Sequence, residues 1–520
     1  MQNLHSYSIF LIFTILVLWT YCTSKKEPIE TRPNILFIMS DDHAYQAISA
    51  YQDHLVQTPH IDRLAREGMI FKNAFVTNSI CAPSRAVLLT GKHSYANGVL
   101  DNRLPFDGTQ DTFIKQLQQA GYETAIIGKW HLKSKPVGFS YYNILRGQGE
   151  YYNPFFITEH DTLQMEGYVT DLTTDLALSW LQNYDNSKPF CLLLHHKAPH
   201  RNWMPNLKHL EFFENIDLPV PETYFDDFST RSAAAYEQEM EIASDMRDAW
   251  DFKIKPGDPD PDNWEDNLYA WHYGKLLTEE QKKIWDAHYD PLNDAYLNAE
   301  MSEKERALWK YQRYIKDYLR CIVSVDENVG RVLDLLDVLK LKYNTLIVYT
   351  SDQGFYLGEH GWFDKRFMYE ESLRTPLLVR YPKKINPGTV NTNLVQNLDF
   401  AATFMDFTGI SDGFGQGQSL VPLFNQENVP DWRDFIYYHY YEYPGAHMVK
   451  RHYGIRTDRY KLIHYYHDID AWEFYDLEKD PNELNNGIDL PEYQDIIHRF
   501  KQNISDNIFY QEDTFQIITE

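Results

Sequence analysis

The fold is decided by the stretch Asn34-Ile35-Leu36-Phe37-Ile38-Met39-Ser40-Asp41-Asp42, an apolar run that ends in two adjacent acids. A second stretch has the same form, Thr345-Leu346-Ile347-Val348-Tyr349-Thr350-Ser351-Asp352-Gln353-Gly354. Short, nearly continuous apolar runs are typical of strands buried on both faces of a parallel sheet. Ligands of open α/β sheets bind beyond the carboxyl ends of the strands, so the acids of both stretches are expected at a binding site.

The acids at these two strand ends indicate a metal site. Two adjacent carboxylates repel each other unless a cation lies between them, and a hard divalent ion with oxygen ligands, usually calcium, suits them. Asp352 would bind through its carboxylate and Gln353 through its amide oxygen. An Asp-Asp pair after a strand is by itself more often a helix cap or a turn. The second acidic strand end, together with the cysteine motif below, favours the metal.

The run Cys81-Ala82-Pro83-Ser84-Arg85, followed by Thr90-Gly91, is the most specific motif of the chain. A lone cysteine before a helix is usually a small apolar side chain. This run, however, resembles the activation motif Cys-x-Pro-x-Arg of the type I, formylglycine-dependent sulfatases. In that family the cysteine is oxidised to formylglycine, and the hydrated aldehyde is the nucleophile. The resemblance implies formylglycine at Cys81, which would also be a ligand of one Ca²⁺ ion, and a formylglycine-generating or anaerobic sulfatase-maturing enzyme as a partner.

Three further motifs extend the resemblance over nearly the whole chain: Gly128-Lys129-Trp130-His131, His195-His196-Lys197-Ala198-Pro199-His200 and Gly358-Glu359-His360-Gly361-Trp362-Phe363-Asp364-Lys365. It implies that Arg85, Lys129 and Lys365 bind the sulfate group. His131 would take a proton from the formylglycine hydrate, and His200 would protonate the leaving alcohol. Gln353 departs from the family pattern, because many members carry Asn there.

Residues 139–156, 195–205 and 354–382 look similar to the N-acetylglucosamine-6-sulfatase group. This implies exo-acting removal of the 6-O-sulfate of N-acetylglucosamine from heparan-sulfate-type glycosaminoglycan fragments, a sulfated glycan being the substrate. Asp364, Arg366 and His447 are the candidates for sugar binding. Equally, Arg366 could pair with a neighbouring acid and His447 could be a surface residue.

Other activities stay open at this point. Another carbohydrate sulfatase, such as an iduronate 2-sulfatase-like enzyme, fits the same motifs. The superfamily also includes phosphoester and phosphonate hydrolases, because one fold can carry several chemistries. A non-catalytic glycan-binding protein would need Cys81 to remain a thiol. The net charge of −26 argues against nucleic acid as a partner, and it requires a locally positive cleft for an anionic substrate.

The 520 residues suffice for a large core and more than one unit. Strands and helices alternate from Asn34 to about Phe407, which predicts an α/β fold with a mostly parallel sheet flanked by helices. The resemblance implies the alkaline-phosphatase-like form of this fold. We assign residues 32–417 to a catalytic sulfatase domain and 418–520 to a smaller C-terminal subdomain. Short strands at 435–443, 452–456, 460–466 and 473–476 predict an antiparallel sheet there, closed by a helix near 493–503.

Other segments have weaker patterns. Helical periodicity covers residues 309–340, whereas 219–291 is a polar and aromatic insertion whose acidic run at 257–262 is expected to be a solvated loop. Thr58 and Pro59 are expected to start a helix, as N-cap and first-turn residue. Cys191, in a predicted strand, and Cys321, in a predicted helix, are expected to be buried thiols.

The N-terminus has the pattern of an export signal. The apolar run 9–19 is too short to span a bilayer, and Cys22 follows it. We interpret residues 1–22 as a signal peptide of the lipoprotein type, with Cys22 as the lipidated residue, and 23–31 as a tether. The protein is then periplasmic or at the cell surface, and it contacts the membrane only through the lipid anchor. A simple cleaved secretory signal is the alternative.

Overall fold

The computed structural model of the protein describes residues 32–257, 260, 262–411, 413–426 and 429–507. The predicted signal peptide, the tether residues 23–31 and the lipidation site Cys22 therefore lie outside the described residues. In the catalytic part the strands are β1 Asn34–Ser40, β2 Met69–Phe71, β3 Ala74–Phe75, β4 Glu123–Gly128, β5 Tyr141–Leu145, β6 Phe155–Ile157, β7 Thr162–Gln164, β8 Phe190–His196, β9 Thr345–Ser351, β10 Leu377–Arg380, β11 Thr389–Asn391 and β12 Val395–Gln396. The helices are α1 Pro59–Glu67, α2 Cys81–Thr90, α3 Ser94–Asn97, α4 Phe113–Gln119, α5 Val169–Asn183, α6 Trp264–Tyr269, α7 Glu279–Asn298, α8 Glu303–Val338, α9 Glu370–Leu373, α10 Asp399–Phe407 and α11 Val421–Phe424.

A ten-stranded sheet forms the centre of the molecule, in the order β11-β2-β10-β9-β1-β8-β4-β5-β6-β7. The five strands β9, β1, β8, β4 and β5 are parallel, and antiparallel pairs occur only toward the edges. The two acidic stretches of the sequence are neighbours in this sheet, because β1 pairs with β9 and Ser40 lies beside Ser351. The predicted mostly parallel α/β sheet is confirmed.

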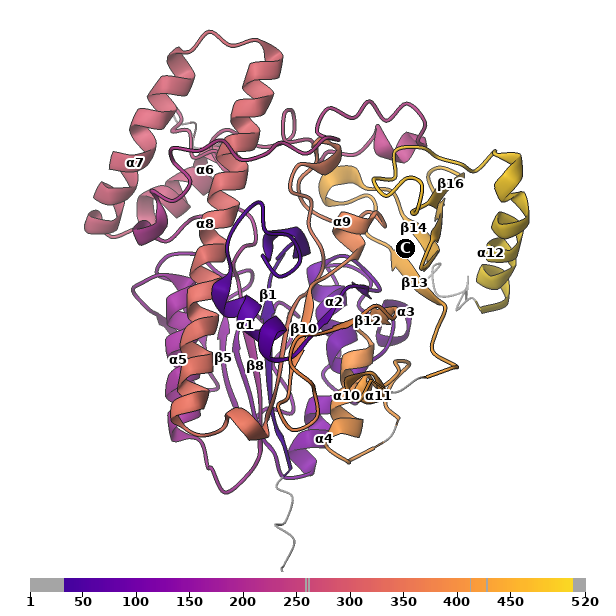
Figure 1. The fold of residues 1–520 in the computed structure, drawn as a ribbon. Coiled ribbons are helices and arrows are strands. Elements are labelled where there is room, and N and C mark those ends of the chain that lie inside the picture. Colours follow the sequence, from indigo (N-terminus) through magenta and orange to yellow (C-terminus); the bar gives the residue numbers. More distant parts are fainter. Residues whose placement is uncertain (1–31, 258–259, 261, 412, 427–428, 508–520) are drawn as a thin grey trace, which may run out of the picture.

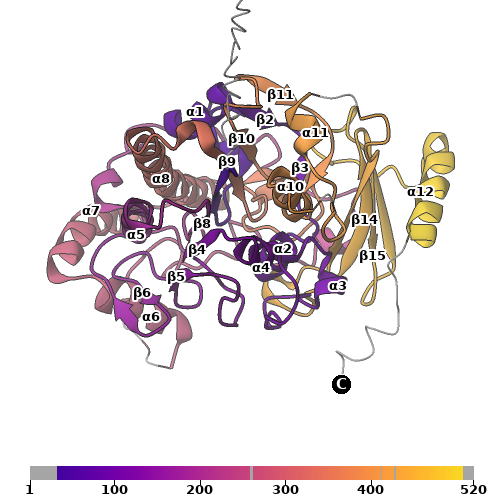
Figure 2. The same ribbon diagram turned by 90° about the horizontal axis from the view of Figure 1, so that it is seen from below.

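Helices cover both faces of the sheet, as Figures 1 and 2 show. On one face lie α1, α5 and α8, and on the other α2, α4 and α10. Strand β1 supplies both cores by alternation: Leu36 and Ile38 pack toward α8, and Ile35 and Phe37 toward α4 and α10. Burial on both faces explains why the strand is apolar at nearly every position.

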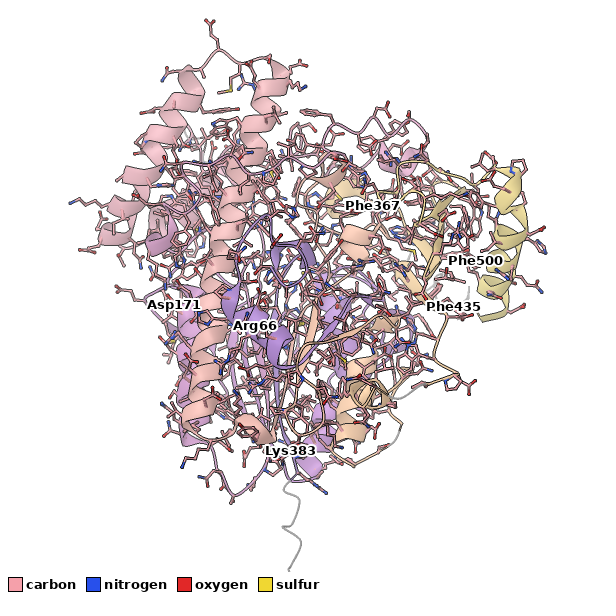
Figure 3. The ribbon with its side chains drawn as sticks, in the orientation of Figure 1. Arg66, Asp171, Phe367, Lys383, Phe435 and Phe500 are labelled. Carbon is pink, nitrogen blue, oxygen red and sulfur yellow. The ribbon has the colours of Figure 1, made fainter. Side chains whose placement is uncertain are left out.

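A separate four-stranded antiparallel sheet follows, with β13 Phe435–Tyr440, β14 His452–Thr457, β15 Tyr460–Tyr465 and β16 Ala471–Asp476. Helix α12, Gln494–Asn507, covers its outer face through apolar side chains that include Phe500. Phe500 and Phe435 of β13 both lie in this unit, at the right of the molecule in Figure 3. The predicted C-terminal sheet and closing helix are confirmed, with strand ends that differ by up to three residues. The domain boundary at 417/418 stays a prediction.

The structure corrects two helical expectations. Helix α8 begins at Glu303, before the expected Trp309, because Ser302 and Glu305 form a capping box. The insertion 219–291, for which no helix was expected from the sequence, contains α6, a π-helical segment at Ala270–Lys275, and most of α7. Of its acidic run, Asp260 and Asp262 are described and exposed, while 258, 259 and 261 lie outside the described residues.

Other expectations hold. Helix α1 begins at Pro59 after Thr58. Cys191 in β8 and Cys321 in α8 are buried free thiols. Within the described part of the chain, every helix is too short or too polar to cross a membrane.

Candidate active site

Three buried carboxylates meet at the carboxyl ends of β1 and β9. Asp41 and Asp42 follow β1, Asp352 follows β9, and their carboxylate oxygens lie within 4.8 Å of one another. The backbone N–H of Asp42, a residue in the left-handed region at φ 65°, donates to Asp352 Oδ1 at 3.1 Å. The parallel register of β1 and β9 therefore brings together acids that are about 310 positions apart in the sequence.

The acids are costly to bury without a cation. Burial, reinforced by the neighbouring carboxylates, raises the pKa of Asp352 to about 8, and burial likewise raises that of Asp42 to about 6. Gln353 Nε2 donates to Asp42 Oδ1, and Gln353 Oε1 is buried without a hydrogen-bond partner among the described residues. The three carboxylates, together with this amide oxygen after a flip of the amide, form a set of hard oxygen donors that fits Ca²⁺.

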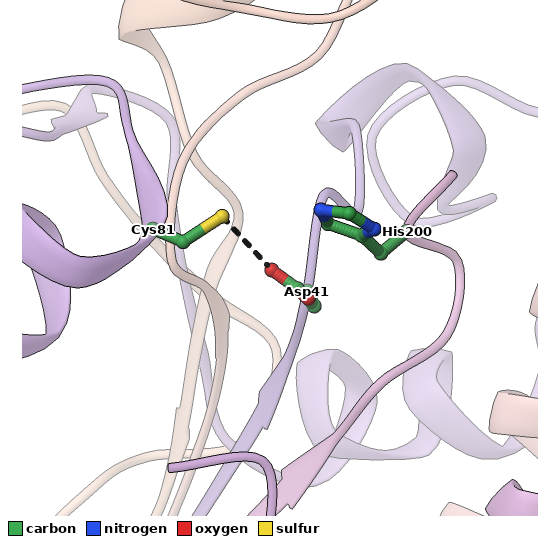
Figure 4. Close-up of side chains that lie close together, drawn as sticks. All are labelled: Asp41, Cys81 and His200. Atoms are coloured by element: carbon green, nitrogen blue, oxygen red, sulfur yellow. Dashed lines mark hydrogen bonds between the residues drawn. The ribbon is translucent and has the colours of Figure 1, made fainter. Parts of the chain in front are cut away.

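Cys81 is the first residue of α2, and its Sγ lies 3.6 Å from Asp41 Oδ1 (Figure 4). In that view Asp41 lies between Cys81 and the ring of His200. The side chain is buried, and burial raises the pKa of the thiol to about 12. At neutral pH the unmodified cysteine is thus a protonated thiol and a poor nucleophile, since the reactive species is the thiolate.

Three cations surround the same acids. Arg85, one turn into α2, donates from Nε and Nη2 to Asp352 Oδ2 at 3.1 and 2.8 Å. Lys129 pairs with Asp41, and its Nζ is 3.9 Å from Cys81 Sγ. Lys365 donates to both oxygens of Asp42 at 2.8 Å. Three buried cations balance three buried carboxylates, so a divalent ion on the acids would leave the cations free to bind an oxyanion.

The motif that carries Lys129 depends on Gly128, at the end of β4. Its φ is 102°, and a Cβ at this position would lie 1.9 Å from the carbonyl oxygen of His195 in β8. Only glycine allows this close approach. Strand β4 can therefore end directly beside β8, and Lys129 and His131 follow at the edge of the sheet where the acids lie.

His131 and His200 are both close enough to the site for the charges of Lys129 and Asp41 to act on them. Burial, with the charge of Lys129, holds the pKa of both imidazoles well below the ordinary value, so both are neutral at pH 7. His200 Nδ1 lies 2.7 Å from the carbonyl oxygen of Arg201, and its Nε2 is 3.8 Å from Asp42 Oδ2. Because a carbonyl only accepts, Nδ1 carries the proton and Nε2 faces the acids.

Asp364, Arg366 and His447 form a cluster beside Lys365. Arg366 Nε donates to Asp364 Oδ1 at 3.0 Å, and His447 Nε2 lies 3.4 Å from Asp364 Oδ2. Arg366 also pairs with Glu442 at 3.2 Å. It therefore pairs with neighbouring acids, as one alternative expected, and at the same time lies beside Lys365. His447 has only 12% of its side chain exposed and is not a surface residue. All three candidates have left-handed backbone, with φ of 73°, 93° and 63°. Such strain is concentrated at functional sites.

Several residues that support the site escaped sequence reasoning. Tyr318 of α8 donates to the carbonyl of Asp42 at 2.7 Å and accepts from the N–H of Ala44 at 2.8 Å, which fixes the acidic turn. The helical periodicity of residues 309–340 indicated that Tyr318 is a core residue, but it did not reveal this contact. Arg201 forms a two-bond ion pair with Asp251 at 2.7 and 2.6 Å, and Asp251 comes from the insertion. No sequence spacing reveals that pair.

Lys197 was also missed, although it lies inside one of the histidine motifs. It is buried, its Nζ lies 4.7 Å from the ring centre of Tyr151, and burial and the nearby Lys129 lower its pKa to about 8. Its position within the motif His195–His200 was the sequence feature that could have indicated a place near the site.

A cysteine at a helix start, paired strand-end acids and three converging cations define a sulfatase. The sulfatase family model matches residues 33–410, and the chain belongs to this family and is a sulfuric ester hydrolase. A second model, the C-terminal part of N-sulphoglucosamine sulphohydrolase, matches residues 358–509.

Among individual relatives, an N-acetylglucosamine-6-O-sulfatase from Bacteroides thetaiotaomicron is 49% identical over 91% of this chain and 85% of its own length. The human N-acetylglucosamine-6-sulfatase is 24% identical over 79% of this chain and 67% of its own. These relatives confirm the predicted likeness to the N-acetylglucosamine-6-sulfatase group.

Solved structures confirm the fold. One protein, described in complex with its substrate D-glucosamine-2-N,6-O-disulfate, has a TM-score of 0.87 at 47% identity and covers 92% of this chain and 97% of its own. A phosphonate monoester hydrolase of Agrobacterium radiobacter has a TM-score of 0.62 at 21% identity, covering 91% of this chain and 95% of its own. The second likeness shows the fold alone.

Proposed function

We propose that this enzyme removes the 6-O-sulfate of terminal N-acetylglucosamine or N-sulfoglucosamine in heparan-sulfate-type glycosaminoglycan fragments. The observation that carries the proposal is the relative of 49% identity named for this activity, which covers 91% of the chain. The solved protein with a bound glucosamine disulfate, at 47% identity, supports the same substrate class. An iduronate 2-sulfatase-like or other carbohydrate specificity is the alternative.

We assign Asp41, Asp42, Asp352, Gln353 and the modified residue 81 as ligands of one Ca²⁺ ion. Bound there, the ion would withdraw electron density from the sulfate oxygens, and formylglycine at residue 81 would supply a hard oxygen nucleophile. The protonated state of the unmodified Cys81 thiol supports this assignment, because a thiol in that state cannot perform the attack itself.

Arg85, Lys129 and Lys365 are assigned to the sulfate group. Each is buried within reach of the acids around Cys81, so their charges act where water does not screen them. They would stabilise the negative charge that builds on the sulfate oxygens, and losing one such contact in a dry site typically costs about a hundredfold to a thousandfold in rate. Arg85 offers a rigid fork of donors, whereas the two lysines offer point charges on flexible stems.

We assign proton transfer to His131 and His200. His131, neutral and without a hydrogen-bond partner on its buried Nδ1 among the described residues, is suited to take a proton from the nucleophile. His200 is held by the Arg201 carbonyl with Nε2 directed to the acids, so we assign it the proton donated to the leaving alcohol. Bound sulfate would raise the low pKa of His200, because an anion favours the charged imidazole.

Asp364, Arg366 and His447 are proposed to bind the sugar ring. A 6-sulfate stands on a flexible exocyclic carbon, so the ring must be fixed through its other groups. The three side chains offer a carboxylate, a guanidinium and an imidazole next to Lys365, and sugar hydroxyls can both donate to and accept from such groups.

We also propose that the enzyme is exported and held at a membrane surface by a lipid on Cys22, with a maturing enzyme that oxidises Cys81. The sequence pattern supports both proposals. Metabolic labelling with a clickable fatty acid would test the first: label lost in Cys22→Ser supports lipidation, and an unlabelled wild type contradicts it.

Activity on a panel of defined sulfated sugars tests the main proposal. We expect hydrolysis of N-acetylglucosamine-6-sulfate and of N-sulfoglucosamine-6-sulfate, with release of the 6-sulfate only. The matched control is N-acetylglucosamine-6-phosphate, which differs in the ester alone. Preference for a uronate 2-sulfate would replace the proposed specificity, and preference for the phosphate would overturn the sulfatase assignment itself.

A further inference from the structure

A cavity of about 480 Å³ lies on the side of α8 that faces away from the acids of the active site. It is lined by α8, by Leu292 of α7 and by the segment 214–220. Residues of an α-helix are spaced 3.6 per turn. The lining residues Trp309, Arg313, Lys316 and Arg320 therefore point away from Tyr318, which contacts Asp42. The hairpin of α7 and α8 is at the upper left of Figure 1.

The walls of this cavity are built from fixed side chains. Gln312 accepts from the N–H of Leu218 at 3.0 Å and donates to its carbonyl at 2.8 Å, so the segment 214–220 is tied to α8. Trp309 stacks on Tyr296 of α7, with ring centres 4.0 Å apart. A volume of a few hundred Å³ with fixed walls is typical of sites for small ligands.

Arg313 is an unpaired cation in this wall. It is 94% buried, and it donates from Nε and Nη2 to the carbonyl of Phe252 at 3.3 and 3.1 Å and from Nη2 to Asn293 Oδ1 at 2.9 Å. Its Nη1 has no hydrogen-bond partner, and it forms no ion pair, within the described part of the chain. Burial lowers the pKa of Arg313, and the charge of nearby Asp317, which forms no ion pair with it, only partly opposes this shift.

Two of the acids near Arg313 already have direct partners. Asp317 accepts from Lys253 at 2.8 Å, Tyr289 at 2.9 Å and Arg320 at 3.0 Å, and Glu214 pairs with Arg320 at 2.7 Å. Arg320 therefore forms two ion pairs, whereas Arg313 has only longer-range attraction, chiefly from Asp317.

Lys316, one turn beyond Arg313, has no ion pair among the described residues either. Its Nζ donates only to the carbonyl of Glu214, at 3.3 Å. Two adjacent cations without carboxylate partners are unexpected in a chain of net charge −26, which has acids in excess. The acids Glu214, Asp217 and Asp317 attract them only without direct ion pairs, so an anion from outside the chain can still form charge-assisted hydrogen bonds with both cations.

We propose that this cavity is a non-catalytic site for an acidic sugar. Arg313 and Lys316 would bind its carboxylate or sulfate. The side chains of Leu292 and Leu308, with the part of Trp309 that is not stacked on Tyr296, would contact the C–H groups of the sugar, and Asp217 at the rim would accept from its hydroxyls. The same enzyme molecule could then hold a glycan at two places. The proposal goes beyond the proposed function and does not depend on which sulfate the active site removes.

Ligand-observed saturation-transfer NMR on the full-length protein tests this site. The two probes are free glucuronic acid, which has no sulfate ester, and N-acetylglucosamine-6-sulfate, used with a Cys81→Ala background so that it is not hydrolysed. The key variants are Lys316→Ala and Arg313→Gln, and the matched control is Lys283→Ala, an exposed lysine on α7 outside the cavity lining.

We expect at least one probe to bind with a Kd on the order of millimolar, and Lys316→Ala to weaken that binding by about tenfold, the loss typical of one charge-assisted contact. Lys283→Ala should leave it unchanged. Turnover of N-acetylglucosamine-6-sulfate by Lys316→Ala, in the active background, should stay at the wild-type level. Binding of glucuronate alone identifies a uronate site, and Lys316-dependent binding of the sulfated sugar alone identifies a sulfate site.

Because the sulfated sugar also binds the active site in the proposed function, only binding that Lys316→Ala weakens counts for this cavity. Absence of Lys316-dependent binding for both probes would overturn the proposal. If Arg313→Gln fails to fold, Lys316→Ala decides the matter alone, since that side chain is only partly buried.

Discussion

Replacing His447 by Ala should separate sugar recognition from sulfate chemistry. The side chain joins two parts of the site: its Nε2 lies 3.4 Å from Asp364 Oδ2, and its Nδ1 donates to the carbonyl of Glu239 at 2.6 Å. Removing it takes one donor from the sugar pocket and leaves the buried Asp364 carboxylate with fewer partners. A lost hydrogen bond to a charged group costs about 1.5–3 kcal/mol. This corresponds to a loss of roughly tenfold to 150-fold in kcat/KM.

The assay compares two substrates that share the sulfate group only. On N-acetylglucosamine-6-sulfate we expect the full loss, whereas 4-nitrophenyl sulfate, which lacks the sugar hydroxyls, should lose less than about threefold. His464→Ala is the matched control, because His464 also contacts an acid, Asp470 at 2.7 Å, but on the C-terminal sheet beside Trp472. This control should change neither rate.

Two results would refute the assignment of His447 to the sugar. One is an equal loss on both substrates with an unchanged melting temperature, which would place the residue in sulfate chemistry. The other is an unchanged rate on the sugar sulfate. Arg366→Lys gives an independent check, since it keeps the charge but loses the fork that holds Asp364 and Glu442.

Three further predictions concern the nucleophile, the metal and acid stability. Cys81→Ser should keep the wild-type melting temperature but lose turnover in a host that modifies only cysteine. Mass spectrometry of the active wild type should show an aldehyde at residue 81. Full activity with an unmodified cysteine would contradict the mechanism. Chelation should lower activity and melting temperature together, because an ion that binds only the folded state stabilises it, and calcium should restore both; unchanged activity of rigorously metal-free enzyme would disprove the metal site. Burial alone would raise the pKa of Asp317, but Lys253 and the neighbouring arginines hold it well below its ordinary value. The contribution of ionised Asp317 to folding stability is therefore complete above the unfolded pKa near 4 and is lost as pH falls below that value. The difference in melting temperature between wild type and Asp317→Asn should shrink between about pH 6 and pH 3. A difference that does not change with pH would exclude this role.

The site could be predicted from sequence where its residues are tied to local patterns. Asp41, Asp42 and Asp352 directly follow buried strands, and the strands are legible because burial on both faces leaves apolar side chains at every position. Cys81 and Arg85 are one turn apart at the start of one helix, so four positions of spacing already place them on the same side.

The three candidates for sugar binding were all predicted from the sequence, but the contacts among them were not. Asp364 and Arg366 are close in sequence, but His447 comes from the loop between β13 and β14, and its contact with Asp364 depends on how the C-terminal sheet packs against the catalytic part. Arg201 and Asp251 show the same limit, since the insertion that supplies Asp251 has no pattern that indicates its partner.

The sequence by itself determined the class of chemistry, the strand-end acids and the motif residues, because these follow from local spacing and from burial that each segment carries in its own composition. Only the tertiary structure decided which cations remain without an ion pair. Arg313 and Lys316 are ordinary helical residues in the sequence, and they become unpaired because Asp317 and Glu214 are taken by Lys253 and Arg320 in three dimensions. Ion pairing depends on distances between segments far apart in the chain, and local patterns do not encode such distances.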